Sequence, residues 1–326
     1  MDLALEDDPG LLGEWFAVAW SRELTTGQLI ARRLLGLDLV LWRSAEGVHC
    51  WRDLCVHRGA KLSLGKLCRE RLVCPYHAWE YNASGQCVHI PSHPNQRPPL
   101  KARAQTYQAR ERYGMVWVCL GEPLGEIPRF PYGDDSAFRL IPSGPYPFHA
   151  KGPRVVENFL DVAHFGFIHA GLLGDAQHAE IEDYEVAMSP HGPEAREIRI
   201  WQPDPDGRGK GATVTYHYWV GAPLTVGLEK VYEDQHFAIL MQVAPVDANT
   251  CEARLVMAID YAHDVPDETF VHFQDQVTAQ DKTVVESQRP ELLPLDLQSE
   301  LHLRSDRMAI AYRKWLREID FSYGTA

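Results

Sequence analysis

Hydrophobic and polar residues alternate over short stretches in the first third of the chain. Three such stretches, separated by turn-forming residues, span positions 34–42, 48–50 and 114–120. Alternation with a period of two is typical of half-buried β-strands. The sequence Asn-Ala-Ser-Gly at positions 82–85 favours a hairpin turn. We therefore predict a small β domain over about residues 15–120.

The pattern changes beyond residue 120. Residues 121–147 contain six prolines together with glycines and aspartates, a composition that predicts a linker. Apolar residues at helical spacing predict a long helix over 268–289, ended by Pro290, and a last helix over about 306–319. Between the linker and these helices the pattern predicts strands at about 195–202, 212–220, 225–233, 236–244 and 252–261.

The composition of the chain narrows the classes of function that need to be considered. The chain has 326 residues, with 45 acidic and 32 basic side chains and a formal net charge of −13. This excess of negative charge argues against nucleic acid and anionic membranes as partners. The sequence has neither an apolar run of the roughly 18 residues that a membrane helix requires nor a signal-peptide pattern, so a cytoplasmic protein is expected. Five of the seven cysteines are expected to be reduced thiols, namely Cys50, Cys68, Cys87, Cys119 and Cys251.

The other two cysteines each stand beside a histidine. Cys55 is followed two residues later by His57, and Cys74 is followed three residues later by His77. Two thiolates and two imidazoles are the ligand set of a Rieske [2Fe–2S] centre, in which two His replace two Cys on one iron. A tetrahedral zinc site is the alternative. Zinc sites usually take both cysteines from one loop, so the arrangement favours the cluster and electron transfer.

A second group of candidate ligands lies further along the chain. Apolar residues predict a helix over about 155–164, on which Asn158, Asp161 and His164 would share one face. His169 follows five residues after His164. Two converging imidazoles and one carboxylate form the facial triad of non-haem Fe(II) oxygenases. The alternative interpretation is that both histidines are hydrogen-bonded core residues.

The carboxylate of such a triad must come from elsewhere. Asp281 stands in the middle of the predicted helix over 268–289, on a partly apolar face. A carboxylate there is costly unless it has a partner or a metal. Asp275 is the second candidate. A solvated Asp281 that pairs with Lys282 or Arg289 is the interpretation without a metal.

Together these motifs resemble the Rieske non-haem iron oxygenases nearly from end to end. The resemblance is strongest to the α-subunit-only (α3) branch, which includes vanillate and dicamba O-demethylases and phthalate dioxygenase. The segment 305–324 looks most like the saxitoxin-pathway hydroxylases of that branch. Val56 and Ala78 depart from the family pattern, which commonly has Pro and Gly there. The motifs that carry the resemblance are Cys55-x-His57-Arg58-Gly59, Cys74-x-x-His77-x-Trp79, Asn158-x-x-Asp161-x-x-His164-x4-His169, and Asp281 with Glu286-x-Gln288.

The resemblance implies an α+β fold in two domains. Residues 1–147 would form an all-β Rieske domain, with the linker from about residue 121. Residues 148–326 would form a helix-grip-type catalytic domain, whose antiparallel sheet and helices hold a mononuclear iron. The [2Fe–2S] cluster would be held by Cys55 and Cys74 on one iron and His57 and His77 on the other, and Fe(II) by His164, His169 and Asp281.

The resemblance also implies an electron path. Asp161 would connect His164 of one subunit with His77 of its neighbour, so the protein would be a homotrimer with head-to-tail electron transfer. Asn158 would lie beside the iron without necessarily binding it.

The expected reaction is oxidation of a small organic substrate by O2. The Gly-rich run 203–211 has neither dinucleotide-binding nor P-loop spacing, so electrons would come from a separate reductase with flavin and a ferredoxin-type cluster. Val277 and Thr278, one helical turn before Asp281, would contact the substrate. The resemblance of segment 305–324 favours hydroxylation at a C–H bond. The alternative is oxidative O- or N-demethylation of an aromatic or alkylated substrate. An electron carrier and a zinc-stabilised binding module are the interpretations from other classes.

Overall fold

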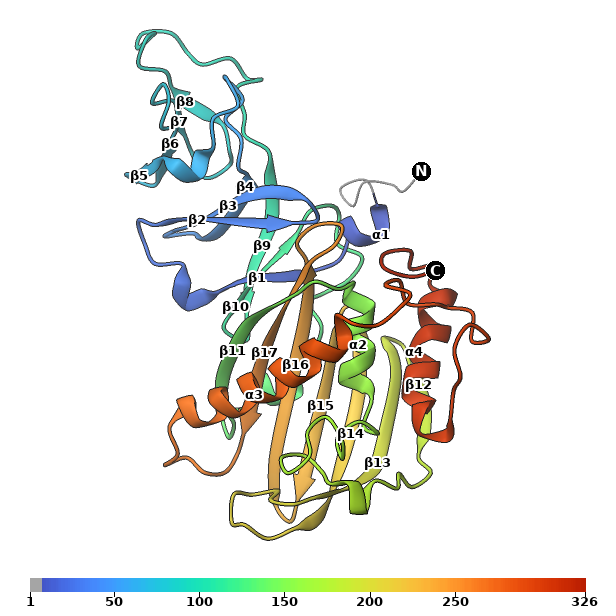
Figure 1. Cartoon of the computed structure of the whole chain (residues 1–326). Helices are drawn as coiled ribbons and strands as arrows, with labels where there is room; N and C mark the ends of the chain where they lie inside the picture. Colours follow the sequence, from blue (N-terminus) through green and yellow to red (C-terminus); the bar gives the residue numbers. More distant parts are fainter. Residues whose placement is uncertain (1–7) are drawn as a thin grey trace. The chain divides into compact units, whose positions relative to one another are not determined.

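The computed structural model describes residues 8–326, which divide into two compact units (Figure 1). The N-terminal unit runs to Ile127 and includes Ala244–Ala248, and the C-terminal unit comprises Pro128–Val243 and Asn249–Ala326. Each unit has its own sheets.

The N-terminal unit contains two antiparallel sheets. The six-stranded sheet has the order β1-β10-β9-β4-β3-β2, and the four-stranded sheet has the order β5-β6-β7-β8. The strands predicted at 34–42, 48–50 and 114–120 are confirmed as β3, β4 and β10. The bounds are β1 Phe16–Trp20, β2 Leu29–Leu34, β3 Leu37–Ser44, β4 Gly47–Arg52, β5 Lys66–Cys68, β6 Arg71–Val73, β7 Glu80–Tyr81, β8 Cys87–His89, β9 Thr106–Arg112 and β10 Met115–Cys119, with a short helix α1 at Pro9–Leu12.

The predicted hairpin turn joins β7 to β8. The N–H of Gly85 donates to the carbonyl of Asn82 at 2.8 Å, and Gly85 has a φ of +80°. A Cβ at this position would lie 2.8 Å from the carbonyl oxygen of Ala104. Glycine is therefore required here both by conformation and by space. The turn closes the small sheet over a core that includes Trp42 and Tyr81.

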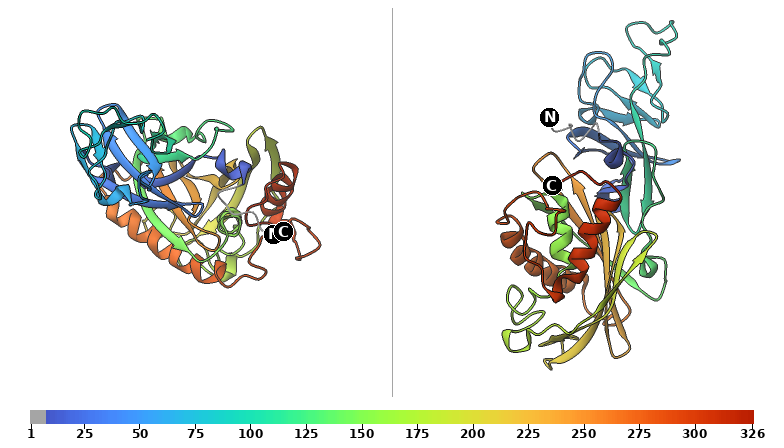
Figure 2. Two further views of the ribbon diagram at one scale, coloured as in Figure 1. Left: turned by 90° about the horizontal axis from the view of Figure 1, so that it is seen from above. Right: turned by 90° about the vertical axis from the view of Figure 1, so that its right-hand side faces the viewer.

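The C-terminal unit is one curled sheet covered by helices. The sheet has the order β11-β17-β16-β15-β14-β13-β12, and α2, α3 and α4 lie on the same side of it (Figures 1 and 2). The expected α+β fold, an N-terminal β domain and an antiparallel sheet with helices, is confirmed. The bounds are β11 Arg139–Phe148, β12 Glu185–Ser189, β13 Gly192–Gln202, β14 Ala212–Ala222, β15 Thr225–Tyr232, β16 Gln235–Pro245, β17 Cys251–Ile259, α2 Gly152–Leu160, α3 Asp267–Val285 and α4 Arg307–Glu318.

Buried and partly exposed side chains alternate along β14, and the buried ones identify the face of the sheet that the helices cover. Val214, Tyr216, Tyr218 and Val220 are buried, and the residues between them are partly exposed. The Tyr218 ring lies 6.0 Å from the ring of Phe159 on α2. The buried set of β14 therefore faces the helices, as a period of two demands.

Two segments differ from the sequence-based expectation. Residues 139–147 of the stretch expected to be a linker belong to β11, which pairs with β17. Three prolines are tolerated in β11 because it is an edge strand, which needs hydrogen bonds on one side only. Helix α2 ends at Leu160, and Asp161 has extended backbone angles. The prediction that His164 shares a helical face with Asn158 and Asp161 was therefore wrong.

Charged groups are buried where α2 meets α4. Arg154 and Arg313 have side chains only 3% exposed. The guanidinium of Arg313 pairs with Glu157 of α2 at 2.5 Å and with Glu300 at 2.5 Å. Arg154 also pairs with Glu300, at 2.8 Å. This buried network fixes α2, and with it the start of the segment that follows, against the rest of the unit.

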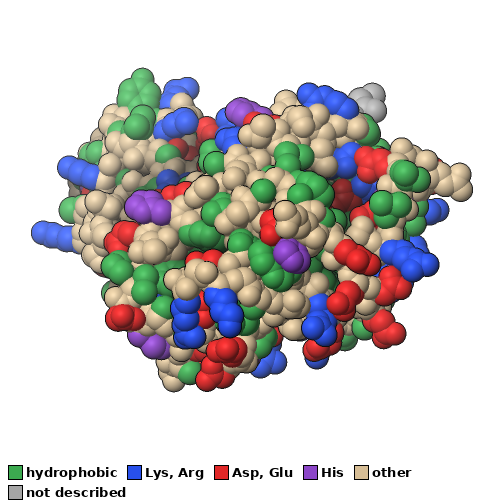
Figure 3. Space-filling model, turned by 60° about the horizontal axis from the view of Figure 1, so that its bottom comes forward, with side chains coloured by type: hydrophobic (Ala, Val, Ile, Leu, Met, Phe, Trp, Pro, Cys, Tyr) green, Lys and Arg blue, Asp and Glu red, His purple; other side chains and the backbone are tan. Residues whose placement is uncertain are grey.

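On the face drawn in Figure 3, acidic and basic side chains are interspersed rather than gathered into one charged patch. No helix among residues 8–326 is both long and apolar enough to cross a membrane.

We predict that Arg313→Met lowers the free energy of unfolding by about 3–5 kcal/mol, because it leaves the carboxylate of Glu157, only 12% exposed, without its main partner. Urea denaturation followed by tryptophan fluorescence would measure this. The control is Arg304→Met, which removes an exposed pair with Asp183 and should cost no more than about 1 kcal/mol. Equal losses in the two variants would contradict the prediction.

Candidate metal centres

Tight turns hold the two cysteine–histidine pairs of the N-terminal unit. Cys55 follows β4, and Cys74 lies between β6 and β7. In the first loop the N–H of Cys55 donates to the carbonyl of Ala60 at 2.8 Å, and the N–H of Gly59 donates to the carbonyl of Cys55 at 2.9 Å. In the second loop the N–H of Cys74 donates to the carbonyl of Trp79 at 2.9 Å. Each loop is thus held by its own backbone hydrogen bonds.

The four side chains fit a Rieske cluster. Cys55 and Cys74 are buried, each 2% exposed, whereas the rings of His57 and His77 are nearer the surface and 4.5 Å apart. Within residues 8–326, Nδ1 of His57 is buried without a hydrogen-bond partner. A buried ring nitrogen is costly in that state unless it binds a metal. Two inner sulfurs and two outer imidazoles match the donor set of a [2Fe–2S] centre.

Buried polar groups around the sulfurs favour a bound cation. Burial raises the pKa of the Cys74 thiol, and the neighbouring Cys55 thiol raises it further. The hydroxyl of Tyr81 lies 3.2 Å from Sγ of Cys55 and could donate to it as a thiolate. Both sulfurs must lose their protons to bind iron, so the positive charge of the irons would compensate for this burial.

The two departures from the family pattern have simple structural explanations. Ala78 has a φ of +54°, a left-handed conformation that costs a residue with a Cβ roughly 1–2 kcal/mol and that glycine adopts freely. The loop therefore requires the same backbone whichever residue is present. Val56 is 44% exposed, so its side chain makes few demands on the loop.

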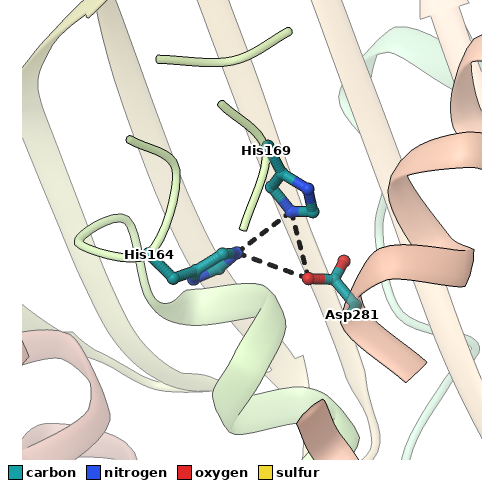
Figure 4. Close-up of side chains that lie close together, drawn as sticks. All are labelled: His164, His169 and Asp281. Carbon is teal, nitrogen blue, oxygen red and sulfur yellow. Dashed lines mark hydrogen bonds and ion pairs between the residues drawn. The ribbon is translucent and has the colours of Figure 1, made fainter. Parts of the chain in front are cut away.

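The second site lies in the C-terminal unit. His164 and His169 belong to a run of turns after α2, and Asp281 lies on α3. Nε2 of His164 and Nε2 of His169 are 3.2 Å apart. Oδ1 of Asp281 is 3.0 Å from Nε2 of His169 and 3.4 Å from Nε2 of His164. The three donor atoms therefore converge on one point (Figure 4).

A glycine allows the turn between the two histidines. A Cβ on Gly166 would lie 2.7 Å from the carbonyl oxygen of Asp175. Only glycine lets this turn approach the segment around Asp175 so closely. The convergence of the two imidazoles therefore comes from a turn, since α2 has already ended.

Hydrogen bonds fix which nitrogen of each ring faces the centre. Nδ1 of His164 is 2.8 Å from Oδ2 of Asp161. Nδ1 of His169 is 2.8 Å from Oε1 of Gln280. Both oxygens are acceptors, so both Nδ1 atoms carry a proton, and in the neutral rings that can bind a metal both Nε2 atoms present lone pairs.

The centre is therefore built for a cation. Two lone pairs and a carboxylate oxygen within 3.0–3.4 Å of one another repel each other unless a positive charge lies among them. Ligands about 2.1 Å from one six-coordinate metal ion, at angles near 90°, would lie about 3 Å apart. Two histidines and one carboxylate with open positions fit a non-haem iron.

The charges around His164 also favour a cation at this centre. Without a metal, a proton on His164 is the positive charge among these atoms: burial works against that charge, but the carboxylates of Asp161 and Asp281 outweigh it and raise the pKa of His164 to about 9. For Asp281, burial works against the negative charge, and hydrogen bonds with the two histidines lower its pKa overall. Negative potential at the convergence point would stabilise a divalent cation.

Other sequence-based candidates lie around this centre. Nδ2 of Asn158 is 3.5 Å from Oδ1 of Asp281, close to the site but at the limit of a hydrogen bond. Asp275, the second candidate for the carboxylate, instead accepts a hydrogen bond from Tyr146 at 2.6 Å. Gln280 was not predicted. It directly precedes Asp281, and residues adjacent on a helix point about 100° apart, so the sequence carried no signal for it.

Val277 and Thr278 are buried on α3, about one turn before Asp281. Nε2 of Gln274 donates to the hydroxyl of Thr278 at 3.1 Å. The substrate-binding role of Val277 and Thr278 stays a prediction, as does the link from Asp161 to a neighbouring subunit.

Comparison with known proteins identifies the family. Residues 14–108 match the Rieske [2Fe-2S] domain, and residues 148–319 match the vanillate O-demethylase oxygenase C-terminal domain. The chain belongs to the vanillate and dicamba branch of the Rieske non-haem iron oxygenases. It is an oxidoreductase with a Rieske [2Fe–2S] cluster and a non-haem iron in its catalytic domain.

Methylxanthine demethylases of Pseudomonas putida are among the similar proteins. The N1-demethylase NdmA is 35% identical over 294 residues, 89% of this chain and 82% of that protein. The N3-demethylase NdmB is 31% identical over 306 residues, with the same coverage. The structure of NdmA has a TM-score of 0.83 at 32% identity and covers 96% of this chain and 92% of that one. Dicamba monooxygenase, at 23% identity and a TM-score of 0.79, shows the fold alone.

These comparisons correct one expectation and support another. The expected special likeness of segment 305–324 to saxitoxin-pathway hydroxylases was wrong, because the similarity found is to the methylxanthine demethylases and extends over 89% of this chain. The expected separate reductase agrees with the family, which uses one, and part of the oxidoreductase NdmD of Pseudomonas putida is similar to this chain. NdmD is 37% identical over 117 residues, 35% of this chain.

Asp281→Ala should lower iron from about three to about two atoms per chain and leave sulfide at about two, because only the mononuclear site loses a ligand. Metal and sulfide analysis of protein purified without oxygen would measure this. Asp275→Asn, on the same helix, is the matched control and should retain all the iron. Equal iron content in the two variants would argue against Asp281 as a ligand.

Gln280→Leu should weaken binding of Co(II) at the mononuclear site roughly 10–100-fold, because His169 loses the acceptor that orients its ring. Titration of protein depleted of mononuclear iron would give the affinity, and the visible spectrum of the cluster should not change. Gln276→Leu, an exposed position on α3, should bind Co(II) like the unmodified protein. An unchanged affinity in Gln280→Leu would rule out this role.

Proposed function

We propose that this protein is the oxygenase component of an N-demethylase that acts on methylxanthine-like substrates. The observation that carries the proposal is the 35% identity to methylxanthine N1-demethylase NdmA over 89% of the chain. A second methylxanthine demethylase, NdmB, is 31% identical over the same share. A structure titled NdmA with caffeine has a TM-score of 0.83 with this chain.

N-demethylation also unites the two reactions considered from the sequence. One oxygen atom of O2 enters a C–H bond of the N-methyl group, and the other leaves as water with two electrons and two protons. The N–CH2OH product then releases formaldehyde and leaves the N–H compound. Hydroxylation of a methyl C–H bond is thus the first half of demethylation, and these relatives favour demethylation as the outcome.

O-demethylation is the second candidate, by the same chemistry at a methyl ether. It is supported by the match of residues 148–319 to the vanillate O-demethylase C-terminal domain. Dicamba O-demethylase is 34% identical over 160 residues, but this covers only 48% of the chain. The coverage favours the N-methyl substrate.

In this proposal the convergent groups hold the two metal sites. Cys55, Cys74, His57 and His77 would bind the [2Fe–2S] cluster, and His164, His169 and Asp281 would bind the iron, which activates O2 when it receives electrons. The residues around the iron would position the substrate. Three protein ligands leave room for O2 and for a substrate that does not itself bind the metal.

Asp161 would carry electrons toward the iron. Its carboxylate accepts the hydrogen bond from Nδ1 of His164, and its side chain is 31% exposed, so its other edge can meet a group from outside. We place His77 of a neighbouring subunit there, which requires a homotrimer assembled head to tail. A separate reductase with flavin and a ferredoxin-type cluster would supply the electrons.

Substrate contacts are proposed for the buried face of α3. Val277 would give an apolar contact, and Thr278 would take part through its hydrogen bond with Gln274. Asn158, whose Nδ2 lies 3.5 Å from Oδ1 of Asp281, would limit the space beside the iron.

The test is turnover of caffeine and theobromine with O2, NADH and a surrogate reductase. We expect equal amounts of formaldehyde and demethylated xanthine, as measured by chromatography and a formaldehyde assay. His169→Ala is the control without mononuclear iron and should form neither. Turnover of a methyl ether with neither methylxanthine demethylated would reject N-demethylation and favour the second candidate.

Asp161→Asn should keep both metal sites but lose nearly all turnover, because the neutral amide cannot connect the two histidines in the same way. Iron content and the cluster spectrum would show that the sites are intact. The rate of cluster reoxidation by O2 in the presence of substrate would show where electrons stop. Near-normal turnover would reject the bridging role.

A further inference from the structure

Lys230 is placed on the side of the catalytic sheet that faces the candidate iron site. In the register of the sheet it lies directly opposite Tyr216 of β14 and Phe237 of β16, so the three side chains share one face. The ring of Tyr216 lies 5.9 Å from that of Phe165, which lies 5.9 Å from that of His169. A short series of ring contacts therefore leads from the iron ligand to the strand position opposite Lys230.

The amine of Lys230 has unused hydrogen-bonding capacity. Nζ donates to the carbonyl of Pro205 at 2.8 Å, and this is its only hydrogen bond within residues 8–326. An ammonium has three donors. The two carboxylates whose charges act on Lys230 already have partners, since Asp204 accepts from the N–H of Gly209 at 2.8 Å and Asp206 pairs with Arg208 at 3.2 Å.

The surroundings make this unused capacity costly. The amine lies 5.5 Å from the ring centre of Phe237. Burial lowers the pKa of Lys230 to about 8, although Asp206 and Asp204 act in the opposite direction. The side chain nevertheless keeps partial exposure. A side chain that is surrounded by protein yet partly exposed can meet a bound molecule, and an ammonium there is stabilised by an acceptor.

We propose that Lys230 is a substrate-recognition residue, whose ammonium donates to an oxygen atom on a planar heteroaromatic substrate. Phe237, which lies opposite Lys230 on β16 and is partly exposed, would give the ring a flat apolar contact. This inference rests on the proposed function, since a methylxanthine carries carbonyl oxygens at the edge of a flat ring.

A purely structural role is the competing interpretation. The hydrogen bond to Pro205 ties the loop 203–211 to β15, and Lys230 could be needed for that alone. Two substitutions of Lys230 distinguish the recognition role from the structural role. Glutamine can still donate to the Pro205 carbonyl but carries no charge, whereas methionine does neither.

The experiment measures binding of caffeine and theobromine by calorimetry, on the assembled enzyme without reductase or oxygen. Lys230→Met and Lys230→Gln should each weaken binding by roughly 10–100-fold, because a hydrogen bond from a charged donor is lost. Lys230→Arg, which keeps a charged donor, should recover most of the affinity. Lys210→Met removes an exposed lysine from the same loop and should bind both compounds like the unmodified enzyme.

The outcomes separate this inference from the proposed function. If the unmodified enzyme binds caffeine and Lys230→Gln binds it equally well, the recognition role is wrong and the proposed function stands. The structural role would then appear as faster proteolysis of the loop 203–211 in Lys230→Met alone. If the unmodified enzyme binds neither compound, the proposed function fails and the inference about Lys230 fails with it.

Discussion

The catalytic unit depends on the convergence of three electron-rich atoms that repel each other. Nε2 of His164, Nε2 of His169 and Oδ1 of Asp281 lie 3.0–3.4 Å apart, and they come from a turn and a helix far apart in the sequence. Such a cluster persists only if the scaffold is firm and a cation can occupy its centre. The covered sheet and the buried charges of Arg154 and Arg313 provide that scaffold.

The sequence allowed both groups of candidate ligands to be chosen because their spacing is local. The Cys–His pairs are two and three residues apart, and the two histidines of the second site five apart. Asp281 could be singled out because a carboxylate on a partly apolar helical face needs a partner. The structure brings His164, His169 and Asp281 together. The β domain and the long strands also form where the sequence alternates between hydrophobic and polar residues.

What the sequence did not reveal depends on tertiary contacts. Residues 139–147 looked like part of a linker because of their prolines, and only pairing with β17 makes them part of an edge strand. The helical periodicity of the sequence continues past Leu160, where α2 ends. Between His164 and His169 the close approach of Gly166 to Asp175 requires a turn instead. Gln280 and Lys230 became visible only through their partners, His169 in one case and the carbonyl of Pro205 in the other.

The unequal support of the two imidazoles has a further consequence. His164 is hydrogen-bonded to an anion and His169 to a neutral amide. The imidazole of His164 therefore takes on part of the character of an imidazolate and is the stronger electron donor of the two. The ligand field at the metal would be unsymmetrical from the outset, with its electron-rich side at His164.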